Sequence, residues 1–99
     1  MKGYRLTEAA DRQLQEIWRY SRDRWGAARA DKYLASIETA LSAALVTPSL
    51  LRPRPDLGKG VVARRTGSHV AYCAIEGDEL VVLAVLHGRM DPKRHLLKQ

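Results

Sequence analysis

The chain has one cysteine, no phenylalanine and no long hydrophobic run. Because the thiol of Cys73 has no partner within the chain, a disulfide scaffold is excluded and a reducing cytoplasm is the expected compartment. The longest wholly apolar run, residues 80–86, is far shorter than the roughly 20 residues that cross a membrane. No secretion signal is visible, since the N-terminus turns polar before any apolar segment develops. We expect a small soluble cytoplasmic protein that does not bind membranes.

The length and the charge give the next constraints. With 99 residues, 45% of them hydrophobic, the chain fits a single domain over residues 1–99, and a two-domain enzyme is excluded. The net charge of +6 is uneven, because residues 1–50 carry eight basic and six acidic side chains and residues 51–99 carry nine and five. Twelve of the 17 cations are arginine, whose planar fork fits phosphate or carboxylate. An anionic partner, either nucleic acid or an acidic protein segment, is one interpretation; a charged surface that maintains solubility is the other.

The first half of the sequence predicts a strand followed by two helices. Residues 3–6 form a short alternating segment, and Thr7 then supplies a helix N-cap. Apolar or small residues recur at helical spacing from residue 10 to 25 and again from residue 30 to 45. Gly26 breaks the first helix and Pro48 ends the second. The two helices should fold back on each other as an antiparallel hairpin.

The second half predicts an antiparallel sheet. Three β-prone segments cover residues 61–66, 69–75 and 80–86, and they are separated by turn sequences at residues 67–68 and 76–79. The last segment is apolar on both faces, so we expect a central strand covered by the hairpin on one side and by the C-terminal tail or a partner on the other. The tail indicates a short terminal helix. The predicted fold is α+β in the order β-α-α-β-β-β, with the hairpin packed on a small, mainly antiparallel sheet.

Motifs for most kinds of chemistry are absent from the sequence. There is no nucleophile elbow, and Cys73 lies within a predicted strand, where a buried inert thiol is typical. The three histidines lack metal-ligand spacing, and the segment Gly58-Lys59-Gly60 lacks the residues of a nucleotide phosphate loop. We therefore predict no metal and no cofactor.

Ribonuclease chemistry is one hypothesis, because it needs no cofactor and suits a small basic domain. It requires a general base, a general acid and cations around the phosphate. His87 is the candidate for proton transfer, with the candidate cations Lys59, Arg64, Arg65 and Arg89. However, His87 has no second acid or base near it in the sequence. Its alternative role is structural, at the end of a strand with a hydrogen bond to nearby backbone or to Asp91.

The two tryptophans also allow two interpretations. Trp18 and Trp25 have arginines around them and could stack on bases, as in single-strand binding proteins. They are also seven residues apart on the apolar stripe of the first helix, where core packing is the favoured role. Of the two, Trp25 is the one nearer the surface by its position at the hairpin turn.

Several segments together resemble a known family. They are residues 4–7, 16–21, 24–26, 67–70 and 85–91, with His95-Leu96 after them. The most specific is Leu86-His87-Gly88-Arg89-Met90-Asp91, directly after an apolar last strand. The ensemble resembles the ParE branch of the RelE/ParE toxins of bacterial toxin–antitoxin pairs, whose fold has the predicted element order.

The resemblance implies a toxin that traps DNA gyrase in its DNA-cleaved state, is not itself an enzyme, and forms a hetero-oligomer with a ParD-like antitoxin. RelE-type relatives instead cut mRNA on the ribosome, which is the alternative function, with His87, Arg64, Arg65 and Arg89 as catalytic candidates. The chain favours the ParE type, because it lacks a tyrosine beyond Tyr72. It departs from the family at residues 72–74, where relatives often have Phe-Tyr-Arg.

The sheet and hairpin are expected to offer an apolar strand face with an arginine-rich rim, which suits an acidic amphipathic peptide. We expect no sequence-specific binding of nucleic acid. The residues predicted to contact a partner are Arg64, Arg65, His87, Arg89, Met90, Asp91 and His95.

Overall fold

The computed structural model describes residues 1–97. Five strands and three α-helices follow in the described chain, with two short 3-10 helices on either side of the second strand. The elements are β1 (Gly3–Leu6), α1 (Glu8–Trp25), α2 (Ala27–Val46), η1 (Pro48–Leu50), β2 (Arg52–Pro53), η2 (Pro55–Leu57), β3 (Val61–Thr66), β4 (His69–Glu76), β5 (Glu79–His87) and α3 (Pro92–Leu96).

The strands form one sheet in the order β1-β5-β4-β3-β2. All neighbours are antiparallel except β1, which runs parallel to β5. The predicted α+β class, helical hairpin and mainly antiparallel sheet are confirmed. The short strand β2 and the two 3-10 helices were not predicted, because this proline-rich stretch carries no alternating pattern.

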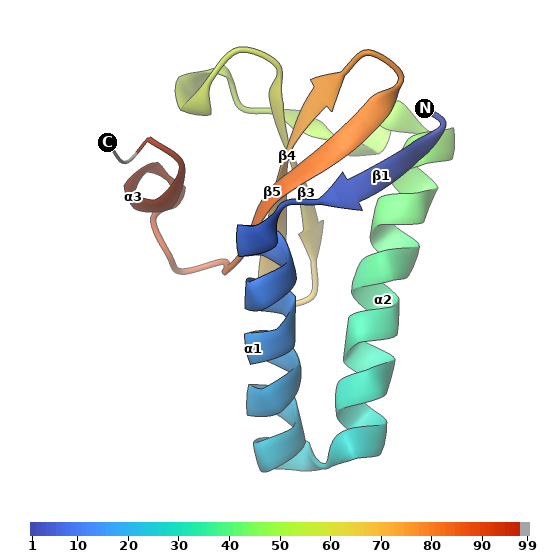
Figure 1. Ribbon diagram of the computed structural model, residues 1–99, viewed down its shortest axis with the longest axis vertical. Helices are drawn as coiled ribbons and strands as arrows, with labels where there is room; N and C mark the ends of the chain where they lie inside the picture. The colour runs from blue at the N-terminus through green and yellow to red at the C-terminus, as the bar shows by residue number, and fades with distance from the viewer. Residues whose placement is uncertain (98–99) are drawn as a thin grey trace.

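The hairpin of α1 and α2 packs on one face of the sheet and extends past its end (Figure 1). Thr7 accepts a hydrogen bond from the backbone of Ala10 at 3.1 Å and so caps α1 as predicted. The largest completely buried side chains lie in this layer, Ile37 and Leu41 on α2 against Leu80 and Val82 on β5.

The favoured core role of the two tryptophans is wrong, although Trp25 is the one nearer the surface, as its position at the hairpin turn predicted. Trp25 is 50% exposed, because it lies at the tip of the hairpin beyond the end of the sheet. Trp18 is half-buried at the seam between the helices and outside the buried clusters. There its indole N–H donates to Asp31 at 2.8 Å, which satisfies a polar group that the core would leave unpaired.

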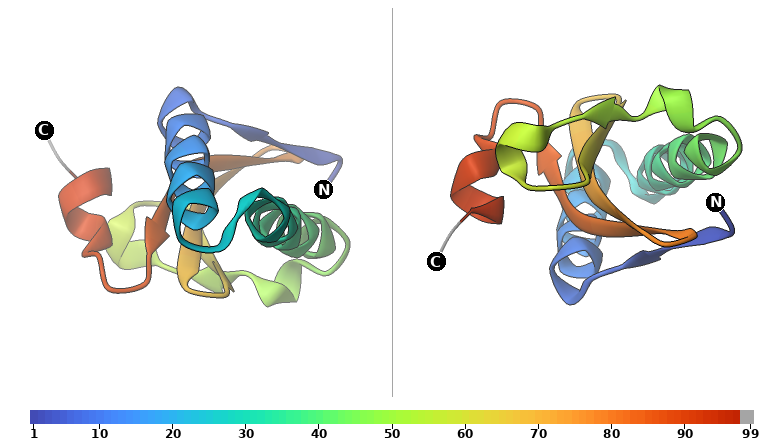
Figure 2. Two further views of the ribbon diagram at one scale, coloured as in Figure 1. Left: turned by 90° about the horizontal axis from the view of Figure 1, so that it is seen from below. Right: turned by 90° about the horizontal axis from the view of Figure 1, so that it is seen from above.

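The opposite face of the sheet has a smaller core, and the tail of the chain covers it. Residues of β3, β4 and β5 form this core with Leu57 of η2, and Leu96 of α3 packs on its margin. Figure 2 shows α3 beside η2. The tail was one of the two covers expected for this face, and the described chain has a helix there.

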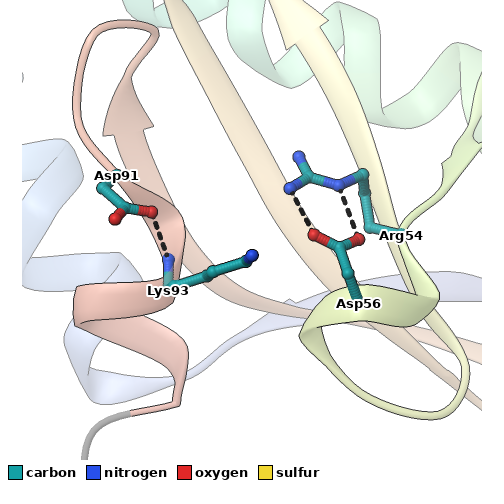
Figure 3. A network of polar contacts seen from close by, with 4 residues as sticks. All are labelled: Arg54, Asp56, Asp91 and Lys93. Atoms are coloured by element: carbon teal, nitrogen blue, oxygen red, sulfur yellow. Dashed lines mark hydrogen bonds and ion pairs between the residues drawn. The ribbon is translucent and has the colours of Figure 1, made fainter.

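Side-chain contacts hold the two parts of this cover in place (Figure 3). Asp91 accepts a hydrogen bond from the backbone of Lys93 at 3.0 Å and caps α3. Arg54 and Asp56 form a two-bond ion pair across η2, with N–O distances of 3.0 and 2.9 Å. These hydrogen bonds from Arg54, with the charge of Lys93 as a further cause, hold the pKa of Asp56 below its usual range.

A β-bulge in β5 determines where the last residues of that strand point. Tyr72 pairs with Ala84 and Cys73 pairs with Val82, which leaves Leu83 as the extra residue. β1 pairs with β5 only as far as Val82. Beyond that residue, side chains of Thr7 and α1 make hydrogen bonds to the β5 backbone. The Thr7 hydroxyl donates to the Leu83 carbonyl at 3.1 Å, and Gln13 accepts from the Val85 N–H at 2.8 Å.

None of the helices in the described part of the chain combines the length and apolar character needed to span a membrane.

Candidate functional site

The bulge brings two histidines together at the end of the sheet. His69, the first residue of β4, pairs with His87, the last residue of β5, and their ring centroids lie 5.5 Å apart. Tyr33 of α2 reaches the same place, and its hydroxyl lies 2.6 Å from Nδ1 of His69. We call Tyr33, His69 and His87 the histidine cluster. It unites two strands and a helix that are far apart in sequence.

A backbone hydrogen bond fixes which nitrogen of the neutral His87 ring carries the proton. Nδ1 of His87 accepts from the Arg89 N–H at 3.1 Å, so the proton lies on Nε2. The Tyr33 hydroxyl accepts from the Ser68 N–H at 3.1 Å and lies 2.6 Å from Nδ1 of His69 and 3.4 Å from the Thr66 carbonyl. Tyr33 therefore ties His69 to the turn between β3 and β4.

Burial and charge act on His69 in the same direction. Its pKa lies below the ordinary value of 6.5, first because burial disfavours the charged ring and second because of the neighbouring His87. His69 is half-buried, whereas His87 is exposed. The neutral His69 ring thus packs edge-to-face against the exposed ring of His87.

Next to the cluster lies a small basic hollow, lined by Arg65, Gly67, Ser68, His87, Gly88 and Arg89, with a volume of about 450 Å³. The turn from β3 to β4 and the turn after β5 are joined there by a hydrogen bond of 2.8 Å from Gly88 N–H to the Ser68 carbonyl. Neither Arg65 nor Arg89 has an acidic partner within residues 1–97.

A second, larger cavity continues from the same residues toward the hairpin. This apolar groove has a volume of about 1030 Å³ and shares Ser68 and His87 with the basic hollow. Apolar and aromatic side chains contribute much of its lining, with cations between them: Ile17, Tyr20, Trp25, Val85, Leu86, Met90, Arg29 and Lys32. Arg29 stacks over the Trp25 ring, 5.2 Å from its centroid.

The structure brings most of the predicted site residues together, but not all of them. Arg65, His87 and Arg89 line the basic hollow, and His87, Met90 and His95 line the apolar groove. Arg64 lies apart from both, because its side chain donates to the Ala40 carbonyl of α2 at 3.1 Å. Asp91 caps α3, and Lys59 lines neither cavity.

Sequence reasoning missed Tyr33 and His69. It also found no acid or base beside His87, whereas His69 lies next to it in space. Of the two structural partners proposed for His87, backbone and Asp91, the backbone is the observed one. Within residues 1–97, no group of three or more histidine, cysteine or acidic residues is arranged to hold a metal ion.

Comparison with known proteins defines the class of this fold and site. A family model described as the ParE toxin of the type II toxin–antitoxin system parDE matches residues 4–92. The chain is 35% identical over 94 residues to Toxin ParE1 of Mycobacterium tuberculosis strain H37Rv, covering 94% of this chain and 96% of that one. It is 32% identical over 96 residues to Toxin ParE1 of Caulobacter vibrioides, covering 97% and 99%. This chain belongs to the ParE toxin family, and it is a toxin of a type II toxin–antitoxin system.

Solved structures agree with this fold. The chain is similar to a chain of the chromosomal ParDE toxin–antitoxin system of P. aeruginosa, with a TM-score of 0.73, 19% identity and coverage of 88% and 95%. It is also similar to a chain of the toxin–antitoxin complex RelBE2 of Mycobacterium tuberculosis, with a TM-score of 0.64, 21% identity and coverage of 86% and 95%. At these identities the likeness concerns the fold.

Proposed function

We propose that this chain is a single-domain cytoplasmic toxin that inhibits DNA gyrase by trapping its DNA-cleaved state. In this proposal a ParD-like antitoxin neutralises it in a hetero-oligomer. The family match over residues 4–92 is the observation that carries the proposal. The buried, unpaired Cys73 is compatible with a reducing compartment.

The apolar groove supports the antitoxin part of the proposal. An amphipathic segment would bury its apolar side against the exposed side chains of Tyr20, Trp25 and Met90. Its acidic side chains would lie near Arg29 and Lys32. Trp25 and Met90 are exposed in the free chain, at 50% and 40%, and would lose this exposure on binding. Exposed tryptophans of this kind are typical binding hot spots.

A titration with the antitoxin tests this interface. Trp25→Ala should weaken binding by roughly thirtyfold, since tryptophan hot spots contribute about 2 kcal/mol or more. Val46→Ala is the control, because Val46 is 85% exposed on α2 and lines neither cavity. If both variants bind as the wild type does, the antitoxin does not use the apolar groove.

The hydrogen bond to His87 favours an inhibitor over a nuclease. A general base must present an unprotonated nitrogen to the hydroxyl that it activates. In neutral His87 the unprotonated nitrogen is Nδ1, which already accepts from the Arg89 N–H. The free side of this exposed ring therefore offers a donor, which binds an anion but does not remove a proton.

A supercoiling assay with purified gyrase tests the proposal directly. Purified toxin added to gyrase and plasmid DNA should block supercoiling and accumulate cleaved DNA, in proportion to the amount of toxin bound to gyrase. Prior addition of the antitoxin should prevent both effects. Unchanged supercoiling at excess toxin would sink the proposal, and growth arrest on expression without antitoxin is the corresponding observation in cells.

A ribosome-dependent mRNA endonuclease is the second candidate, and the pairing of His69 with His87 is the observation that favours it. The His87 imidazole lies beside Arg65 and Arg89, and the His69 ring contacts it from behind, so the types of group that phosphodiester cleavage uses are present. Primer extension on translated message should then show new ends that disappear with His87→Ala. Intact message during growth arrest would dismiss this candidate.

A further inference from the structure

We propose that the basic hollow is a phosphate site that binds a backbone phosphodiester of DNA. That the hollow contacts the DNA bound by gyrase rests on the proposed function. The phosphate site itself is defined by the groups that line the hollow, and these groups recognise no base sequence.

The lining of the hollow is rich in hydrogen-bond donors and contains no carboxylate. Arg65 comes from the end of β3 and Arg89 from the turn after β5, so the two guanidinium groups reach the hollow from different segments. In the described chain, the arginines with an acidic partner are Arg5, Arg22 and Arg54, and neither Arg65 nor Arg89 has one. Their charges are thus available to an external anion.

His87 adds a neutral donor of fixed direction. Because Nδ1 accepts from the Arg89 N–H, the proton of the neutral ring lies on Nε2, on the free side of the imidazole. The Ser68 hydroxyl, also in the lining, has no partner within residues 1–97. Two cations, an imidazole N–H and a hydroxyl reach the hollow from different segments. A phosphodiester can accept from all four, because its two non-bridging oxygens accept over a wide range of directions, whereas the acceptor sites of a carboxylate lie near one plane.

Two hydrogen bonds hold the backbone around the hollow, so the two turns that carry the donors are positioned in advance. The Ser68 N–H binds the Tyr33 hydroxyl, and the Ser68 carbonyl binds the Gly88 N–H. A side chain at position 88 would start 3.5 Å from a guanidinium nitrogen of Arg65, so the glycine leaves the space beside that group open. The donors therefore meet an anion without first losing other partners.

Two double variants of equal charge separate a built site from a general attraction. One is Arg65→Gln with Arg89→Gln. The control is Arg12→Gln with Arg19→Gln, two exposed arginines of α1 that line neither cavity. The probe is a fluorescein-labelled 20-base-pair DNA duplex, followed by anisotropy at several salt concentrations. Circular dichroism and thermal melting establish that each variant is folded.

Loss of the two hollow arginines should weaken duplex binding by about a hundredfold, about tenfold for each charge-assisted contact. It should also lower the slope of log K against log salt by about 0.9, the contribution of the one phosphate that the hollow binds. The control variant should change both quantities much less. In nuclear magnetic resonance titrations with the duplex, the amides of Ser68, Gly88 and Arg89 should shift in the wild type and remain in place in the Arg65/Arg89 variant.

Three results are decisive. Equal losses in the two double variants would overturn the site, because only net charge would then matter. If the Arg65/Arg89 variant loses affinity for the antitoxin and keeps its affinity for the duplex, the hollow binds carboxylates and the proposal is wrong. If the wild type binds the duplex through these residues but does not inhibit gyrase, the phosphate site stands and the proposed function fails.

Discussion

At the scale of single residues, the contact between Gly67 and Tyr33 fixes the turn that carries the site. Gly67 has a φ of +59°, and a Cβ there would lie 2.9 Å from the Tyr33 ring. Gly67→Ala should therefore lower the free energy of unfolding by roughly 2–4 kcal/mol, about 1 from the backbone and the rest from the clash. Urea unfolding followed by circular dichroism measures the change.

Gly77 provides a matched control for this prediction. It has a φ of +61°, but a Cβ there would meet nothing within 4 Å. Gly77→Ala should cost the backbone part alone, about 1 kcal/mol. In a Tyr33→Ala background, the added cost of Gly67→Ala should fall to the same value, because the ring is gone. If Gly67→Ala and Gly77→Ala lower the free energy of unfolding by the same amount in the wild-type background, the Tyr33 ring moves aside at no energetic cost.

The depressed pKa of His69 predicts how stability depends on pH. Since burial and His87 hold this pKa below 6.5, the unfolded chain binds a proton at a higher pH than the folded chain does. The free energy of unfolding should thus decrease as the pH falls below about 6.5, and level off once the folded ring is also protonated. His69→Gln should flatten this part of the profile. A decrease as steep in the variant as in the wild type, between about pH 7 and pH 5, would assign the effect to other groups.

At the scale of elements, periodicity and turn residues predicted most of the fold. The first strand, the cap at Thr7, the break at Gly26 and the third strand lie where the sequence placed them. The pairing of His69 with His87 could not be predicted from the sequence, because it depends on the β-bulge in β5. Counting outward from the turn between Glu76 and Glu79 puts His69 opposite Leu86, and the extra residue Leu83 shifts the register by one.

The parallel pairing of β1 with β5 was also not foreseen, because it joins the two ends of the chain and no local signal encodes it. The same holds for Tyr33. On the sequence it is one more residue near the apolar stripe of a helix, and its role arises from the tertiary contact with the β3–β4 turn. The sequence therefore predicted site residues that lie close together along the chain. It did not predict the histidine cluster, because the fold brings Tyr33, His69 and His87 together from three separate elements.

The cover of the second sheet face gives a prediction for α3. Leu96 is half-buried against the core that contains Leu57, Tyr72 and Leu86. Leu96→Ala should lower the free energy of unfolding by about 1–2 kcal/mol, less than a fully buried leucine would. It should also speed hydrogen exchange in α3 with little effect on β4. Leu97→Ala, at a position that is 43% exposed, is the control. Unchanged exchange in α3 would show that the Leu96 side chain does not hold this helix on the sheet.

At the scale of the whole molecule, the two cores give the site its support from opposite sides. The hairpin side positions Tyr33 and His69, and the side with η2 and α3 supports Leu86 beneath the turn that carries His87 and Arg89. The basic hollow and the apolar groove lie where these supports meet at one end of the sheet. A partner bound there would contact both halves of the molecule and stabilise them together.

The single thiol offers a measurement of this joint stability. Cys73 lies in β4 beneath the hairpin, completely buried, and burial raises its pKa to about 12. At pH 8, iodoacetamide should therefore label the native protein at least about a thousandfold more slowly than the urea-unfolded chain, because reaction requires global opening. Gly67→Ala should speed labelling by about tenfold for each 1.4 kcal/mol of lost stability. Saturating antitoxin should slow it, since binding favours the folded state. A native rate within tenfold of the unfolded rate would contradict this, because the sheet would then open locally at β4 without unfolding of the hairpin.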